Sequence, residues 1–367
     1  MTRLLILEGD GIGPEIVAAT RRVIEAADRA HGLGLTLETA EIGFAALAAQ
    51  GTTCPDEVIA RARAADGVVM GPVSHNDYPP VSEGGINPSA RLRIGLDLFA
   101  NIRPARTPAG VAARRPMDLI IVRENTEGFY ADRNMAQGLG EMMVTADVGI
   151  ALRRITRPAC RRIAETAFAL AGARPRRRVT AVHKANVLRM TDGLFLEETR
   201  RSAAAHPDID YQEVLVDAMA AHLVRDPDRH DVIVTTNMFG DILSDLATEL
   251  AGGLGLASSL NAGETRAMAQ AQHGSAPDIA GRGIANPASL IASVAMLFDW
   301  LADRQGPAFR LAAAGIRRGL DAATADPAVR TPDLGGSGTT EGMGRYVAAA
   351  VGDCGTRPGN AEAEDVT

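Results

Sequence analysis

The amino-acid sequence predicts an α/β fold built on a largely parallel, buried sheet. Apolar runs of strand length alternate along the chain with amphipathic segments of helix length. The runs lead into polar or glycine-bearing turns, and a helical pattern follows. This alternation is typical of a sheet that is covered by helices on both faces.

The first part of the chain shows this alternation most clearly. The run 4–7 is expected to be a buried first strand, because Glu8 and Asp10 interrupt it too early for the apolar core of a signal peptide. The elements that follow are a helix at 14–30, a strand at 35–42, a helix at 55–64 and a strand at 67–70.

Later in the chain, further strands are expected at 119–122, 179–183, 211–216 and 232–235. Three segments, 72–88, 132–141 and 254–284, are irregular and too long for simple connections. Long loops in α/β proteins usually carry function, so we expect the functional site among them. The polar tail 352–367 is predicted to be disordered.

Composition excludes several classes of protein. The 367 residues are 46% apolar and 23% charged, as in an ordinary soluble globular protein. A net charge of -7 leaves no surplus of positive charge for a nucleic acid or an anionic membrane. No stretch approaches the ~20 apolar residues that a membrane span needs. The cysteines, Cys54, Cys160 and Cys354, are odd in number and widely spaced, which predicts a reducing, cytoplasmic compartment.

The chain contains a single lysine, Lys184, among its 38 basic residues. Arginine cannot lose its proton in a protein, whereas the pKa of a lysine shifts readily when the side chain is desolvated. Lys184 is therefore a candidate for proton transfer. The alternative is a surface lysine without a function.

Two aspartates indicate a metal site. Asp241 and Asp245 stand four residues apart at the start of the helix expected after strand 232–235, so they project from one face. A divalent cation would relieve their repulsion, and oxygen ligands favour Mg²⁺ or Mn²⁺. Asp217, at the end of strand 211–216, could complete the cluster. The alternative is that Asp241 complements the helix N-terminus and Asp245 is solvated.

Three arginines and a tyrosine are candidates for substrate binding and proton donation. Arg123 follows an apolar strand, at the edge of the sheet where α/β proteins bind ligands, and Pro104 holds Arg103 extended. Together with Arg93, they would suit a substrate that carries two or more carboxylates. Tyr130 is a candidate proton donor or, alternatively, a packing residue.

Two glycine-bearing segments were compared with nucleotide-binding loops. The segment 9–15 (GDGIGPE) has the wrong glycine spacing for the dinucleotide fingerprint. The segment 273–281 (HGSAPDIAG) is small and turn-rich, and can approach a flat cofactor closely. Asp278 within it would favour a ribose diol and repel a 2′-phosphate.

Six motifs together resemble one enzyme family, the metal-dependent β-decarboxylating dehydrogenases, which include isocitrate, 3-isopropylmalate, homoisocitrate and tartrate dehydrogenases. The resemblance extends to about Val351. The motifs are GDGIGPE at 9–15, LDLFANIRPAR at 96–106, VRENTEGFY at 122–130, HKANVL at 183–188, GDILSDL at 240–246 and HGSAPDIAG at 273–281.

The resemblance implies an isopropylmalate-dehydrogenase-like fold, in which two α/β domains surround a cleft, and not a standard Rossmann fold. It implies a discontinuous large NAD-binding domain at 1–98 and 255–351, and a smaller substrate, metal and dimerisation domain at 99–254. It also implies a homodimer with shared active sites.

The same resemblance implies the reaction. A (2R)-3-substituted malate would be oxidised and decarboxylated to a 2-oxo acid and CO₂ with NAD and Mg²⁺ or Mn²⁺. Arg93, Arg103 and Arg123 would grip the malate carboxylates. Tyr130 and the partner's Lys184 would move protons.

The resemblance also implies the ligand sites. Asp241 and Asp245, with the partner's Asp217, would hold the metal. The residues expected at the NAD site are His273, Gly274, Ser275, Ala276, Asp278, Ile279 and Asn286.

The residues expected near the C3 substituent differ between branches of the family. Ile86, Ser89 and Ala90 stand where the isopropylmalate branch has a glutamate and two leucines. Asn87 and Ser89 reverse the order found in isocitrate enzymes, and Val187 resembles the isopropylmalate and homoisocitrate branches. The substrate therefore stays open among isopropylmalate, homoisocitrate and isocitrate types, with tartrate or D-malate as an alternative. Two hypotheses from other classes are a noncatalytic regulatory subunit and an acyl transferase.

Overall fold

The computed structural model describes residues 1–108, 110–113, 115–130 and 140–352. Its helices are α1 Gly13–His31, α2 Phe44–Gln50, α3 Asp56–Ala64, α4 Pro88–Gly95, α5 Arg157–Gly172, α6 Thr191–Ala205, α7 Val216–Arg225, α8 Asn237–Ala251, α9 Ala288–Gln305, α10 Ala308–Ala325 and α11 Thr340–Gly352. Its strands are β1 Thr2–Leu7, β2 Leu35–Ala40, β3 Gly67–Met70, β4 Ala100–Arg106, β5 Asp118–Glu124, β6 Glu141–Thr145, β7 Val148–Ala151, β8 Arg178–His183, β9 Asp210–Leu215, β10 Val232–Thr235, β11 Leu260–Ala262 and β12 Ala267–Gln270.

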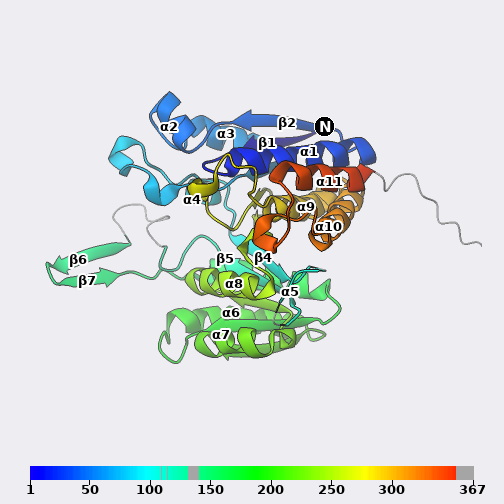
Figure 1. Cartoon of the computed structure of the whole chain (residues 1–367). Coiled ribbons are helices and arrows are strands. Elements are labelled where there is room, and N and C mark those ends of the chain that lie inside the picture. Colours follow the sequence, from blue (N-terminus) through cyan, green and yellow to red (C-terminus); the bar gives the residue numbers. More distant parts are fainter. Residues whose placement is uncertain (109, 114, 131–139, 353–367) are drawn as a thin grey trace, which may run out of the picture.

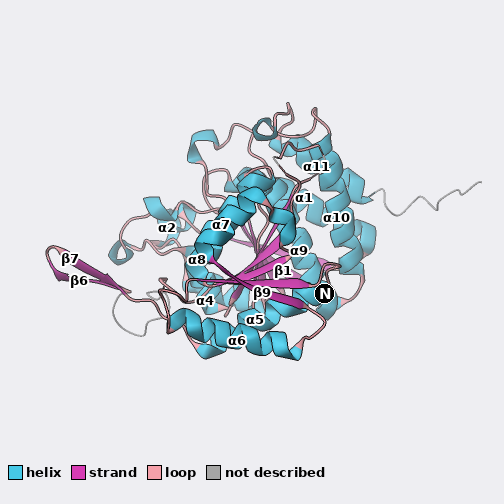
Figure 2. Ribbon diagram, turned by 90° about the horizontal axis from the view of Figure 1, so that it is seen from below, coloured by secondary structure: helices cyan, strands magenta, loops and turns pink. Residues whose placement is uncertain are grey.

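A single ten-stranded sheet runs through the molecule in the order β2-β1-β3-β12-β11-β4-β5-β10-β8-β9. The outer strands on both sides pair in parallel, whereas the central pairs β12–β11, β11–β4 and β4–β5 are antiparallel. Helices cover both faces (Figures 1 and 2). The predicted α/β class with a largely parallel sheet is therefore confirmed, while the antiparallel centre was not predicted.

The sheet consists of two five-stranded halves that meet where β11 pairs with β4. We call β2-β1-β3-β12-β11 the first half and β4-β5-β10-β8-β9 the second half. In Figure 1 the first half lies with α1 and α9–α11, and the second half lies with α5–α8. The domain boundaries expected near residues 98 and 254 stay a prediction.

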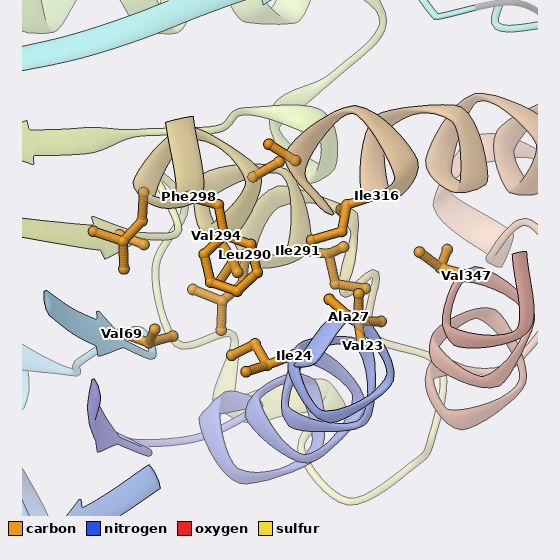
Figure 3. Close-up of a cluster of buried hydrophobic side chains, with 14 of the residues drawn as sticks. Val23, Ile24, Ala27, Val69, Leu290, Ile291, Val294, Phe298, Ile316 and Val347 are labelled. Carbon is orange, nitrogen blue, oxygen red and sulfur yellow. The ribbon is translucent and has the colours of Figure 1, made fainter. Parts of the chain in front are cut away.

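The largest core fills the space between the first half of the sheet and four helices. Amphipathic α1 directs Val23 and Ile24 toward α9 and α11, and α9 contributes a continuous apolar face that includes Val294 and Phe298 (Figure 3). Separate apolar clusters lie on the opposite face of this half and on both faces of the second half. None of the helices in the described ranges is long and apolar enough to cross a membrane.

Several local predictions were wrong. The segment 254–284 was expected to be irregular, but it contains β11 and β12, which are short and contain no β-branched or aromatic residue. The strand expected at 211–216 ends at Leu215, so Asp217 lies in the first turn of α7.

The expected loop 72–88 is confirmed, since it holds only two short 3-10 turns before α4. Most of 132–141 and of the tail lies outside the described residues, and Gly352 still belongs to α11.

The glycine-rich segment 9–15 contacts three segments that are distant in the sequence. Gly11 adopts a left-handed φ of +57°, and an added Cβ atom would lie 2.1 Å from the carbonyl oxygen of Ser275. The backbone N–H of Ile12 donates to that same oxygen at 2.8 Å. The Asp10 carboxylate accepts from the backbone N–H groups of Phe44 and Ser74 at 2.8 and 3.0 Å. This motif therefore orders neighbouring segments through its own backbone and through the Asp10 side chain.

We expect Gly11→Ala to lower the free energy of unfolding by at least about 2 kcal/mol, because the methyl group meets Ser275 and the left-handed backbone disfavours a Cβ atom. Gly193→Ala in α6 is the matched control. Its added Cβ has no heavy atom within 4 Å, so it should stabilise the protein by up to about 1 kcal/mol. Urea denaturation measures both, and a Gly11→Ala protein as stable as its parent would contradict the close packing.

Candidate active site

A cavity of about 270 Å³ lies between the two halves of the sheet. Nine of the residues that the sequence predicts for the site line it: Asn87, Ser89, Arg93, Arg103, Arg123, Tyr130, Asp241, His273 and Gly274. They come from α4 and the residue before it, from β4, β5 and α8, and from the loops after β5 and β12. The cavity therefore gathers residues that are up to 187 positions apart, from Asn87 to Gly274.

Two buried arginines meet the aspartates of α8. Arg103 is 5% exposed, and its Nη1 lies 3.1 Å from Asp241 Oδ1 and 3.3 Å from Asp245 Oδ1. Arg123 is 2% exposed and also donates to Asp241 Oδ1. Gly240 allows this approach, since a Cβ atom there would lie 2.7 Å from Arg123 Cβ. The spacing prediction that both aspartates share one helix face is confirmed.

Electrostatics at this end of the cavity favours the ionised form of Asp241. Burial opposes the charged form of Asp241, but the guanidinium groups of Arg123 and Arg103 outweigh it and hold the pKa of Asp241 below its usual range. Burial and the charge of Arg123 lower the pKa of Arg103 to about 10. Asp241 and Arg103 are therefore both charged at neutral pH.

Tyr130 completes this charged cluster. Its hydroxyl donates to Asp241 Oδ2 at 3.2 Å, and the Arg123 guanidinium lies 5.8 Å from the centre of its ring. The side chain therefore lies in the cavity and is not a packing residue on an amphipathic face, which was the alternative.

Lys184 and Asp217 lie elsewhere, in contact with each other. Lys184 Nζ is 2.5 Å from Asp217 Oδ1, and this contact lowers the pKa of Asp217. The side chain of Asp217 is 66% exposed. Neither residue lines the cavity of its own chain, and neither does Val187, which is 67% exposed. In the part of the chain that the structure describes, no three His, Cys, Asp or Glu side chains are grouped to hold a metal.

The loop after β12 forms another wall. His273 faces the cavity, Ser275 is buried with its Oγ 2.7 Å from Ser74 Oγ, and Asp278 is exposed. Ala276 adopts a left-handed φ of +38°, a strained conformation for a residue with a Cβ atom. Asn286 is buried, and its side chain donates to Asp333 Oδ2 at 2.9 Å.

Polar residues that the sequence reasoning missed hold the arginines in place. Asn237 Oδ1 accepts from Arg123 Nε at 2.9 Å, and Ser244 Oγ accepts from Arg103 Nη1 at 2.7 Å. Both residues share the face of α8 that carries Asp241, so helical spacing could have found them. Gln270 in β12 accepts from Arg93, and its sequence context gave no such signal.

Comparisons with known proteins agree with this geometry. The family model described as isocitrate/isopropylmalate dehydrogenase matches residues 3–347. The chain belongs to the isocitrate/isopropylmalate dehydrogenase family. It is a β-decarboxylating dehydrogenase, an NAD(P)-dependent oxidoreductase that oxidatively decarboxylates 3-substituted malates. The resemblance and the enzyme class predicted from the sequence are confirmed.

The relatives of this dehydrogenase differ in the substrates that their names state. An isocitrate/homoisocitrate dehydrogenase of Thermus thermophilus is 42% identical over 350 residues, covering 95% of this chain and 98% of its own. A 3-isopropylmalate dehydrogenase of Archaeoglobus fulgidus is 39% identical, covering 96% and 100%. The crystal structure of isocitrate dehydrogenase from Methylococcus capsulatus superposes with a TM-score of 0.85 at 38% identity, covering 96% of this chain and 100% of that one. Members of the family use NAD(P), a divalent metal and small carboxylic acids.

Behind Arg123, the motif at 122–130 also buries two glutamates. Glu127 Oε1 accepts from the backbone N–H of Thr156 at 2.8 Å, and the carbonyl oxygen of Glu127 accepts from Asn237 Nδ2 at 2.9 Å. Burial, together with the charge of Glu124, raises the pKa of Glu127 to about 7. Glu127 thus connects the start of α5 to the residue that holds Arg123.

This raised pKa predicts a pH-dependent stability. The contribution of Glu127 to the free energy of unfolding is fully present below the pKa of the unfolded state, about 4.5. It is lost as the pH rises through the pKa of the folded state, about 7. Glu127→Gln keeps an oxygen acceptor but cannot ionise, so its stability relative to the parent should rise between pH 5 and pH 8 by up to about 3 kcal/mol. Urea denaturation across this pH range measures the difference. Glu165→Gln, at an exposed position of α5, is the control. A difference that does not change with pH would contradict the assignment.

Proposed function

We propose that this dehydrogenase uses NAD⁺ and Mg²⁺ or Mn²⁺ to oxidise and decarboxylate a (2R)-3-substituted malate, as a homodimer with two shared active sites. The observation that carries the proposal is the convergence of Arg93, Arg103 and Arg123 with Asp241 and Tyr130 on one cavity. Guanidinium groups bind carboxylates in a forked geometry. Three of them suit a substrate that has at least two carboxylates.

Two residues are proposed to move protons. Hydride leaves C2 of the malate while the partner's Lys184 accepts the proton of the C2 hydroxyl, which yields a β-keto acid. After CO₂ leaves, Tyr130 donates a proton to C3 of the resulting enolate. The hydrogen bond from Tyr130 to Asp241 inside the cavity supports this role.

The donor set of α8 fits a hard divalent cation. Asp241 and Asp245 offer carboxylate oxygens one helical turn apart, and Asp241 is held in its charged form. Among the residues that the structure describes, one chain groups no third ligand with these two carboxylates, so the partner's Asp217 is proposed as the third ligand. When bound, the cation supplies a Lewis acid for the negative charge that develops during decarboxylation.

The loop 273–281 fits a nucleotide. His273 Nδ1 contacts the Gly274 carbonyl at 2.9 Å, while its buried Nε2 has no hydrogen-bond partner among the described residues. NAD⁺ supplies the hydride acceptor when bound. Asp278 is exposed at the outer side of this loop, where a carboxylate would repel the 2′-phosphate of NADP⁺. His273, Gly274, Ser275, Ala276, Asp278, Ile279 and Asn286 are the proposed cofactor residues.

Exposed apolar side chains support dimerisation of the second half. Met142, Met143 and Ile150 on the β6–β7 hairpin are 51%, 66% and 46% exposed, and the hairpin extends away from the body of the molecule (Figure 1). Val187 and Ile242 are 67% and 59% exposed. Such a set of apolar residues is expected at an interface. The same interface would carry Lys184 and Asp217 together into the partner's cavity, because the two residues contact each other.

A direct assay tests the proposed function. Purified protein with Mn²⁺ and NAD⁺ should reduce the nucleotide with at least one of isocitrate, homoisocitrate, 3-isopropylmalate, D-malate or tartrate, followed by the absorbance of NADH. NADP⁺ should be used at least about tenfold less efficiently in kcat/KM, and EDTA should abolish turnover until Mn²⁺ is restored in excess. The absence of turnover with every malate would favour a noncatalytic subunit. Equal use of NADP⁺ would overturn only the cofactor assignment.

Mixed dimers test the shared sites. Lys184→Met and Tyr130→Phe homodimers should each lose at least ~10²-fold in kcat. A heterodimer of the two, purified through two different tags, should recover about half of the parent activity, because one of its two sites combines an intact Tyr130 with an intact Lys184 from the other subunit. If Lys184 served the cavity of its own chain, the heterodimer would be no more active than the homodimers.

A further inference from the structure

We propose that Gln270 determines substrate specificity, and that its side-chain amide donates a hydrogen bond to a C3 substituent that ends in a carboxylate. The proposal rests on the proposed function and names the class of malate that the site selects. Gln270 lines the cavity and is 8% exposed.

The orientation of the Gln270 amide follows from its neighbours. Its Oε1 atom lies 3.2 Å from Arg93 Nη2 and 3.1 Å from Ser89 Oγ. It also accepts from Asn261 Nδ2 at 3.2 Å. A guanidinium group can only donate, so the oxygen of Gln270 must be the atom that faces Arg93. The Nε2 atom therefore points away from these three donors.

Asn261 fixes this orientation from behind. Its Oδ1 accepts from Asn101 Nδ2 at 3.1 Å and from Asn125 Nδ2 at 3.0 Å, which leaves its own Nδ2 to face Gln270. Asn261 and Asn101 are 0% exposed and Asn125 is 1% exposed, so water does not compete for these bonds. Rotation of the Gln270 amide would break the contacts to Arg93, Ser89 and Asn261 together.

The two N–H groups of Gln270 are left for a ligand. Among the described residues, no acceptor contacts Gln270 Nε2. The buried polar atoms that lack a hydrogen-bond partner do not include it. Since Gln270 lines the cavity, we infer that Nε2 faces it. A substituent without an acceptor would cover these N–H groups and leave them unpaired, which is unfavourable.

The position of Gln270 in the cavity indicates which part of the substrate it would contact. Arg103, Arg123, Tyr130 and Asp241 contact one another at one end of the cavity, where the proposed chemistry takes place. Ser89 and Arg93 both donate to Gln270, and these three residues form a second group. A substituent at C3 that extends from the reacting end would reach this second group.

The group formed by Ser89, Arg93 and Gln270 favours binding of an anion. Arg93 supplies a positive charge, and Ser89 and Gln270 supply neutral polar groups. The side chain of Asn87 also lines the cavity, while its Oδ1 is occupied by the backbone N–H of Ala90 at 3.2 Å. A carboxylate accepts from all of these donor types, whereas an isopropyl group accepts from none.

The test compares two malates that differ only in the substituent, isocitrate with a carboxymethyl group and 3-isopropylmalate. The parent enzyme should favour isocitrate by at least about tenfold in kcat/KM. Gln270→Met removes the amide, and Gln270→Glu keeps an oxygen acceptor but replaces the N–H groups by a negative charge. Both variants should lower the isocitrate-to-isopropylmalate ratio by at least about tenfold, whereas Gln305→Glu at the exposed end of α9 should leave it unchanged.

If Gln270 had a purely structural role, its substitution would lower kcat/KM for both substrates equally through Arg93. The isocitrate-to-isopropylmalate ratio would then stay unchanged, which would overturn the proposal. A parent enzyme that favours 3-isopropylmalate would overturn it as well. The ratio of the dissociation constants for the two malates is measured by calorimetry with Mn²⁺ and without nucleotide. If the Gln270 variants bind isocitrate with a smaller preference over 3-isopropylmalate than the parent does, the specificity role is supported even when no malate is oxidised. Failure of this inference is therefore distinguishable from failure of the proposed function.

Discussion

A chain of three buried amide side chains joins the two halves of the cavity, and the rest of the site depends on it. Asn101 in β4 accepts from Arg103 Nε at 2.5 Å and donates to Asn261 in β11. Asn261 in turn donates to Gln270 in β12, which accepts from Arg93. An amide that lost its partner in this dry region would cost about 1–3 kcal/mol. The three amides therefore hold Arg93 of α4 and Arg103 of β4 in one fixed arrangement.

This amide chain also explains which parts of the fold were predictable. Strands such as β1, β3, β8 and β10 are buried on both faces and appear in the sequence as apolar runs. The central strands β4, β11 and β12 carry Asn, Arg or Gln where the site needs them, and β11 and β12 have only three and four residues. Periodicity needs longer segments than these.

The candidate site was predictable where local sequence determines geometry. The spacing of Asp241 and Asp245 on a helix, and the position of Arg123 after an apolar strand, both follow from secondary structure alone. Gln270 was not identified, because an amide in a short segment looks the same in sequence whether it faces solvent or holds an arginine. The contact between Lys184 and Asp217 was not identified either, since it joins the loop after β8 to α7 and depends on tertiary packing.

The packing of α1 against α11 has a consequence for synthesis on the ribosome. Val23 and Ile24 of α1 belong to the same core as Val347 of α11, and β3 pairs with β12 (Figure 3). The core that covers the first half of the sheet therefore cannot be completed until α11, near residue 352, has been made, whereas the strands of the second half all lie between residues 100 and 235. The apolar face of α1 stays uncovered during this interval, which is when chaperone binding would limit aggregation of the nascent chain.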